Sequence, residues 1–202
     1  MLSDRFFFPL FVVIIVALIY GAVTFGPRSE AVESPLSGDP LLGFVIEGDA
    51  LKLINSGAGM VDEFIDDPIG GKYVRTVSSQ PVNSGVLHAG TALAFLPDIG
   101  EAWQGNTVYF SVVMRKPKLK GSDDVLLRFY YVAHGNGERV MCELTEQWQP
   151  CYTKHKIKVS DAAPNLSFIG VWPDTKGLGR YVEIKKITVQ VGKPFDEEAA
   201  ND

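Results

Sequence analysis

The stretch Asn106–Val132, "NTVYFSVVMRKPKLKGSDDVLLRFYYV", decides the fold class of this chain. From Val108 to Met114 every second residue is large and apolar, which is the period of a β-strand with one buried face. The second half is apolar on both faces apart from Arg128, so it predicts a strand at the centre of a sheet. Proline, glycine and aspartate between the halves mark a turn. The stretch therefore predicts two consecutive β-strands.

Other strands of this kind lie before and after this stretch in the chain. They are "KYVRTVS" (72–78), "NLSFIGVWPD" (165–174) and "RYVEIKKITVQVG" (180–192). Turn residues separate them, and the chain shows none of the strand-helix alternation that is typical of a parallel sheet. The pattern predicts an all-β domain, an antiparallel sandwich or barrel.

The last of these strands changes its parity half-way. Val182 and Ile184 share one face of a regular strand, whereas the apolar residues from Ile187 to Val191 share the other. A β-bulge near Lys185-Lys186 turns all of these apolar side chains to the same side, so we predict a bulge there.

Length and charge limit the possible functions. The chain has 202 residues, of which 46% are hydrophobic, and a net charge of −5. This length fits one domain that is large enough to bury a core. The negative charge argues against nucleic acid as a partner, because phosphate binding needs a basic patch.

The N-terminal run Phe6–Phe25, "FFFPLFVVIIVALIYGAVTF", has no charged residue. Its length matches the roughly 20 apolar residues with which a helix crosses a bilayer, so we expect a single-pass transmembrane anchor. The alternative is a cleaved signal peptide, with "SEA" (29–31) before the cleavage point, but the apolar run is longer than that of a signal peptide.

The rest of the organisation follows from composition. We expect a cytoplasmic stub at residues 1–5, a transmembrane helix at 6–25, a flexible linker at 26–40, the β-sandwich at 41–192 and a disordered acidic tail at 193–202. We expect the protein in the inner membrane of a Gram-negative-type bacterium, with its N-terminus in the cytoplasm and its main domain in the periplasm.

Both cysteines, Cys142 and Cys151, lie in the stretch "MCELTEQWQPCY" (141–152). Side chains alternate in a strand, and by this parity both cysteines point to the apolar side of their segments. A hairpin through "TEQWQP" brings them opposite each other, so we predict a disulfide in an oxidising compartment. The alternative is a pair of unlinked core cysteines. A zinc site is not expected, because two cysteines do not supply the number of ligands that zinc requires.

Four stretches together carry a resemblance. They are "NSGVLHAGTALAFLPDIGEAWQGNTVYFSVVMRK" (83–116), "VLLRFYYV" (125–132), "LTEQWQPCYTKHKIKV" (144–159) and "LSFIGVWPDTKGLGRYVEIKKITVQVG" (166–192). The order and the aromatic positions resemble a jelly-roll carbohydrate-binding module of the galactose-binding-like type, over most of Gly43–Gly192. The resemblance implies an antiparallel jelly-roll sandwich, a glycan ligand, and a core-packing role for Trp148. The opening "GFVIEGDALKL" (43–53) departs from the family pattern, which leaves the family's structural calcium site open here.

No set of residues indicates catalysis. The chain lacks the common hydrolase, metalloprotease and phosphate-loop motifs. His155 is interpreted as a partly buried structural histidine, and adjacent acids such as Asp123-Asp124 as solvated loop residues rather than a glycosidase pair. We therefore expect no enzymatic activity and no cofactor. Glu47, Asp49 and Glu183 approach one another if the first and last strands pair, but we predict no metal site.

Aromatic side chains are the best candidates for ligand binding, because a flat sugar face stacks on an aromatic ring. We selected Trp103, Tyr130, Tyr131 and Trp172. Trp103 lies in the turn "GEAWQGN" and is expected to be exposed. One of the two adjacent tyrosines must face away from the other, and Trp172 has either a rim or a core position.

The sequence leads to two hypotheses for function. The first is a non-catalytic, membrane-anchored module that binds a glycan or another component of the cell envelope. The second is an accessory subunit that uses the same domain to bind a protein partner in a membrane complex. A sandwich hosts many functions, so the choice between them needs the site itself.

Overall fold

The computed structural model describes residues 39–82, 89–132 and 134–196, together with Phe11, Ile14, Ile15 and Leu36. Most of the expected anchor and stub, most of the linker and the end of the tail lie outside these described residues. Phe11, Ile14 and Ile15 are helical. Within the described residues, no helix has both the length and the apolar character that crossing a membrane requires.

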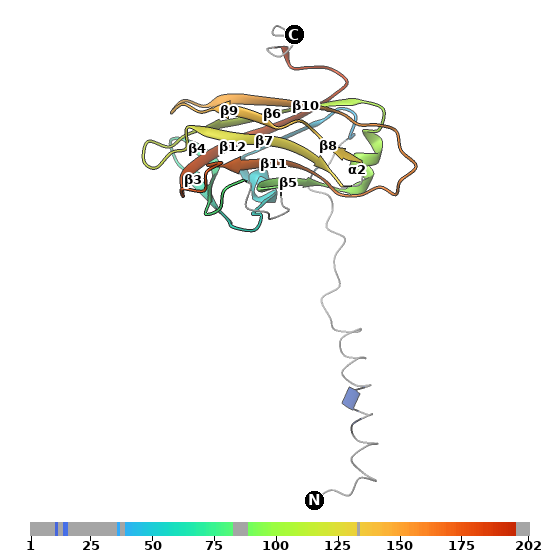
Figure 1. Cartoon of the computed structure of the whole chain (residues 1–202), viewed down its shortest axis with the longest axis horizontal. Coiled ribbons are helices and arrows are strands. Elements are labelled where there is room, and N and C mark those ends of the chain that lie inside the picture. The colour runs from blue at the N-terminus through green and yellow to red at the C-terminus, as the bar shows by residue number, and fades with distance from the viewer. Residues whose placement is uncertain are drawn as a thin grey trace, which may run out of the picture. The chain divides into compact units, whose positions relative to one another are not determined.

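The described part of the chain folds into two six-stranded antiparallel sheets, shown in Figure 1. Sheet A contains β1 (Phe44–Glu47), β3 (Met60–Asp67), β4 (Gly71–Ser78), β6 (Thr107–Arg115), β10 (Gln149–Lys156) and β12 (Tyr181–Val191). Sheet B contains β2 (Ile54–Asn55), β5 (Thr91–Phe95), β7 (Asp124–Tyr131), β8 (Gly135–Asn136), β9 (Val140–Glu143) and β11 (Ser167–Pro173). Two short helices are added, the 3₁₀-helix η1 (Gly48–Leu53) and α2 (Pro97–Ala102).

The order of the strands explains why the domain closes on itself. Sheet A runs β10-β6-β12-β4-β3, with β1 also paired to β12, so the first and last strands of the domain are neighbours. Sheet B runs β2-β5-β11-β7-β8, with β9 paired to β7. The predicted antiparallel sandwich is confirmed, and β7 lies inside its sheet as its apolar sequence requires.

The core lies between the sheets and follows the predicted parity. In β6 the four alternate side chains from Val108 to Met114 are fully buried. The register of β12 against β6 shifts between Ile184 and Lys186, so the predicted bulge is confirmed. The bulge keeps the apolar residues of β12 on the inner face, where Val182, Ile184, Ile187 and Val189 are almost completely buried and Val191 is partly buried.

The disulfide between Cys142 and Cys151 is present, with 6.1 Å between the two Cα atoms. Its setting differs from the predicted hairpin. Cys142 pairs with Val125 in sheet B, whereas Cys151 pairs with Val112 in sheet A. The chain crosses from one sheet to the other between β9 and β10, so the disulfide links the two layers instead of two strands of one ladder.

Candidate ligand-binding face

The first sequence candidate, Trp103, lies in the core. Its side chain is 0% exposed and packs edge-on against Phe95, with 4.9 Å between the ring centroids. The indole N–H donates to the carbonyl of Pro40 at 2.9 Å, which satisfies the one polar group of the ring. The prediction of an exposed Trp103 is therefore wrong. The turn that carries it follows α2, and this helix directs the ring between the sheets.

The other candidates divide between core and surface. Trp172 and Tyr131 are buried, at 3% and 1% exposure, so neither offers a ring face to a ligand. Tyr130 is half-buried and points away from Tyr131, as strand parity predicted. It lies on the outer face of sheet B, with the guanidinium of Arg128 5.2 Å from its ring centroid. Its role in ligand binding stays a prediction.

The sequence interpretation placed Trp148 on the wrong side of the sheet. It was expected in the core, but it is half-buried and lies on the outer face of sheet A, the face that points away from sheet B. Its ring meets that of Tyr73 edge-on at 5.8 Å. The guanidinium of Arg115 lies 4.2 Å and the ammonium of Lys185 5.4 Å from the indole. Part of an aromatic ring is thus exposed among cationic groups.

A buried carboxylate organises the cations of this face. Glu183 is 1% exposed, and β12 places it between Arg75 of β4 and Arg115 of β6. Arg75 donates through Nε and Nη2 to Glu183 Oε1, at 3.0 and 2.7 Å. Arg115 donates through Nε to Oε2 at 2.6 Å. The hydrogen bond to Glu183 raises the pKa of Arg75, which keeps that guanidinium charged.

These bonds leave several guanidinium donors unused. An arginine has five N–H groups in a planar fork. Within the described part of the chain, no hydrogen bond engages Nη1 or Nη2 of Arg115, or Nη1 of Arg75. The two side chains remain 27% and 33% exposed. The face therefore presents fixed donors to solvent beside the indole of Trp148.

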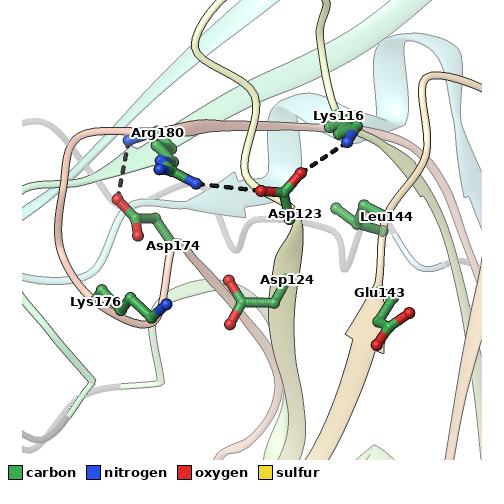
Figure 2. A pocket seen from close by; sticks show the side chains of 8 residues that line it. All are labelled: Lys116, Asp123, Asp124, Glu143, Leu144, Asp174, Lys176 and Arg180. Atoms are coloured by element: carbon green, nitrogen blue, oxygen red, sulfur yellow. Dashed lines mark hydrogen bonds and ion pairs between the residues drawn. The ribbon is translucent and has the colours of Figure 1, made fainter.

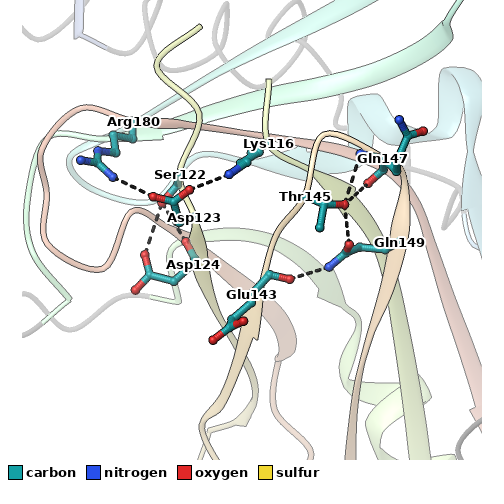
Figure 3. A network of polar contacts seen from close by, with 9 residues as sticks. All are labelled: Lys116, Ser122, Asp123, Asp124, Glu143, Thr145, Gln147, Gln149 and Arg180. Carbon is teal, nitrogen blue, oxygen red and sulfur yellow. Dashed lines mark hydrogen bonds and ion pairs between the residues drawn. The ribbon is translucent and has the colours of Figure 1, made fainter. Parts of the chain in front are cut away.

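The loop that carries Trp148 is held at both ends, as Figure 3 shows. The side chain of Gln149 donates to the carbonyl of Glu143 and accepts from the hydroxyl of Thr145. The backbone of Gln147 donates to the same hydroxyl at 3.2 Å. The Cys142–Cys151 disulfide joins the two chain segments that flank the loop. A loop constrained in this way loses little conformational freedom when a ligand binds.

A second candidate is a cavity of about 430 Å³ among the loops next to this face. Figure 2 shows the residues that line it: Lys116, Asp123, Asp124, Glu143, Leu144, Asp174, Lys176 and Arg180. Asp123 forms ion pairs with Lys116 at 2.7 Å and Arg180 at 3.3 Å, and the bond to Lys116 is the main reason why its pKa is lowered. Because these carboxylates contact neighbouring loops, we interpret them as structural groups and not as ligand-binding groups.

The three acids that were considered for a metal site take part in ion pairs. Glu47 pairs with Lys186 and Asp49 with Lys52 and Lys72, while Glu183 is held by the arginines. β1 and β12 do pair, yet the three carboxylates do not converge. Among the described residues no group of three metal-ligating side chains occurs.

His155 is half-buried between the sheets, as interpreted from its parity. Its ring lies 5.5 Å from that of Phe129 in sheet B. Burial, with a smaller contribution from Lys158, lowers the pKa of His155. His134 stacks on Tyr131 at 4.1 Å, and His88 lies outside the described residues.

The comparisons with known proteins agree on the fold. No family model matches the sequence, and no curated protein matches it either. Among solved structures, the CBM22-1 xylan-binding domain from Paenibacillus barcinonensis Xyn10C superposes with a TM-score of 0.52 and 14% identity, over 78% of this chain and 97% of its own. The C-terminal family 22 carbohydrate binding module of Clostridium thermocellum Xyn10B gives 0.52 and 14%, over 77% and 96%.

A third structure, the CBM22-2 xylan-binding domain of the same Paenibacillus protein, has a TM-score of 0.51 and 11% identity, over 73% of this chain and 98% of its own. At such low identity the likeness concerns the fold alone. The predicted jelly-roll sandwich is therefore a fold that this chain shares with these structures, and the ligand has to be argued from the side chains.

Proposed function

We propose that this protein is a non-catalytic module that binds a glycan on the outer face of sheet A. The observation that carries the proposal is the half-buried ring of Trp148 beside unused guanidinium donors. A sugar offers apolar C–H groups on its ring face and hydroxyl groups at its rim, and this face supplies a partner for each. Support also comes from the three similar structures, which are carbohydrate-binding modules.

The geometry suits binding without chemistry. The ring of Trp148 is fixed by the edge-on contact with Tyr73 and by the clamped loop. The donors of Arg75 and Arg115 are fixed by Glu183. Glu183 is held by both arginines and is buried, so it does not act as a general acid or base here. Preorganised groups of this kind raise affinity because little ordering remains to be done on binding.

The proposal includes the place of the module in the cell. The apolar run Phe6–Phe25 supports a single-pass anchor, with the N-terminus in the cytoplasm and the sandwich in the periplasm. The disulfide supports an oxidising compartment. A reporter that is active only outside the cytoplasm, fused after Gly192, is expected to be active. A full-length but inactive fusion would contradict this orientation.

Retention of the detergent-solubilised full chain on immobilised envelope polysaccharides and peptidoglycan tests the binding function. Trp148→Ala is expected to abolish retention with a nearly unchanged melting temperature, because the ring is only half-buried. Tyr130→Ala is the comparison variant, because Tyr130 is also a half-buried ring near an arginine but lies on sheet B. Retention that persists in Tyr130→Ala would confine binding to sheet A, whereas loss of retention in this variant alone would move the site to sheet B. No retention of the wild type, together with co-purification of a membrane complex, would instead support an accessory subunit.

A further inference from the structure

We infer that the glycan is acidic, and that its carboxylate binds Arg115 and Lys185 at the edge of Trp148. This inference rests on the proposed function and adds the class of ligand. It starts from the number of cationic groups around one ring. The guanidinium of Arg115 and the ammonium of Lys185 both lie within 5.4 Å of the indole centroid.

Lys185 is the least explained of these cations. It lies in β12 at the bulge, where the register shifts between Ile184 and Lys186. The neighbouring Lys186 pairs with Glu47 at 3.2 Å, whereas no ion pair engages Lys185 within the described part of the chain. An ammonium without an ion pair can donate hydrogen bonds to the hydroxyl groups of any sugar. Its charge adds a further attraction only when the ligand is an anion.

Arg115 supplies the geometric part of the argument. Its Nε–H is committed to Glu183, and its guanidinium is held over Trp148. Its two terminal nitrogens therefore keep a fixed direction while remaining available. A planar guanidinium matches a carboxylate through two parallel hydrogen bonds, which a single hydroxyl group does not provide.

The charges on this face balance as a whole but are unevenly placed. Arg75, Arg115 and Lys185 carry three positive charges, and Glu183 carries one negative charge. Two further acids lie on the face: Glu63, which is exposed in β3 and faces Arg75 across the sheet, and Asp67, which interacts electrostatically with Arg115. The attraction for an anion therefore comes from the position of Arg115 and Lys185 beside Trp148 and not from a positive excess of the whole face.

The position of a sugar carboxylate fits this arrangement. In a hexuronic acid the carboxylate is attached directly to the ring carbon, so it projects from the rim when the ring face lies on an aromatic side chain. A uronate that contacts the exposed part of Trp148 thus places its carboxylate next to the two cations at the rim of the indole. Stacking and charge recognition then act on the same sugar unit.

The test compares polymers that differ only in charge. Polygalacturonate and alginate are used beside their carboxyl-reduced forms, which keep the sugar rings but carry no carboxylate. The full chain in a neutral detergent is expected to bind the acidic forms at least roughly tenfold more tightly, because hydrogen bonds to a charged group contribute about 1.5–3 kcal/mol. Raising the salt concentration should weaken this preference.

Three variants locate the effect. Lys185→Gln removes the charge of a half-buried side chain without touching Glu183 and is expected to lower affinity for the acidic polymers only. Arg115→Lys keeps the charge but loses the planar fork, and it should reduce the same affinity by roughly tenfold. Lys120→Gln, on an exposed loop, is the control for general charge and should leave binding unchanged.

The outcomes separate the inference from the function on which it rests. Equal binding to the acidic and reduced polymers, lost in Trp148→Ala, would overturn the acidic ligand and leave the glycan-binding function in place. Binding to neither polymer would also overturn the inference, while the wider retention test decides the function. Equally strong binding to dextran sulfate that persists in Trp148→Ala would show general attraction to polyanions and overturn the specific site.

Discussion

The outer faces of the two sheets both place an arginine near a tyrosine ring, but they are built differently. On sheet B, Arg128 and Tyr130 are two residues apart in one strand, and the Nε of Arg128 donates to the carbonyl of Gly137. On sheet A, Arg115 lies near both Tyr73 and Trp148, which come from distant parts of the chain. A buried carboxylate, Glu183, fixes the arginines only on sheet A.

A buried counter-ion turns a polar surface into a candidate binding face. A single strand can place an arginine beside an aromatic ring, but among the described residues no buried carboxylate pairs with Arg128 on sheet B. On sheet A, the charge of Glu183 is stabilised only if both guanidiniums stay in contact with it. That requirement fixes the donors, and the clamped loop fixes the ring of Trp148.

The largest expected effect comes from removing the feature that only sheet A has. Glu183→Gln leaves two partly buried guanidiniums without a counter-ion, so it should lower the free energy of unfolding by about 3 kcal/mol. Chemical denaturation measures it. Glu63→Gln, an exposed acid on the same sheet, is the control and should stay within about 0.5 kcal/mol. An unchanged free energy of unfolding in Glu183→Gln would show that Glu183 does not hold the two arginines of sheet A in place.

A smaller effect is expected from breaking the link between the layers. Replacing both Cys142 and Cys151 by serine should lower the free energy of unfolding by about 2–3 kcal/mol, because the short loop they close gains freedom in the unfolded chain. The same change loosens the Trp148 loop, so affinity for a glycan should fall as well. Unchanged stability, or free thiols in protein from the envelope, would contradict this prediction.

The smallest effect is a pH dependence at the contact between the sheets. The pKa of His155 is lowered below its ordinary value of 6.5, so the unfolded chain binds a proton before the folded one does. The free energy of unfolding should therefore fall as the pH drops below about 6.5, down to the lowered pKa of the folded state. His155→Gln should flatten that part of the profile. An identical slope in the variant would assign it to other groups.

The fold followed from local patterns that survive without a tertiary structure. Alternation in β6, the apolar run of β7 and the parity change in β12 each report which face of a strand is buried, and burial is what a sandwich core requires. The cysteines were paired correctly for the same reason. Their placement in different sheets was not visible, because parity says nothing about which sheet a strand joins.

The candidate site was misjudged at the tryptophans. Trp103 and Trp148 both lie in polar turns, and the sequence interpretation exchanged their positions by placing the first at the surface and the second in the core. A turn leaves the direction of its side chains to the elements around it. α2 directs Trp103 inward, and the crossing from β9 to β10 leaves Trp148 on the outside. The cations beside Trp148, which are Arg115 and Lys185, come from other strands and are not its neighbours in sequence.

The strands, the bulge, the bonded cysteines and the class of fold could be predicted from the sequence, because each depends on residues that are neighbours along the chain. The tertiary structure decided which aromatic ring meets solvent and which charges surround it. Arg75, Arg115, Trp148 and Glu183 are brought together by strand pairs that join residues 68 and 108 positions apart. Contacts over such separations are set by the packing of the whole sandwich, which no local pattern encodes.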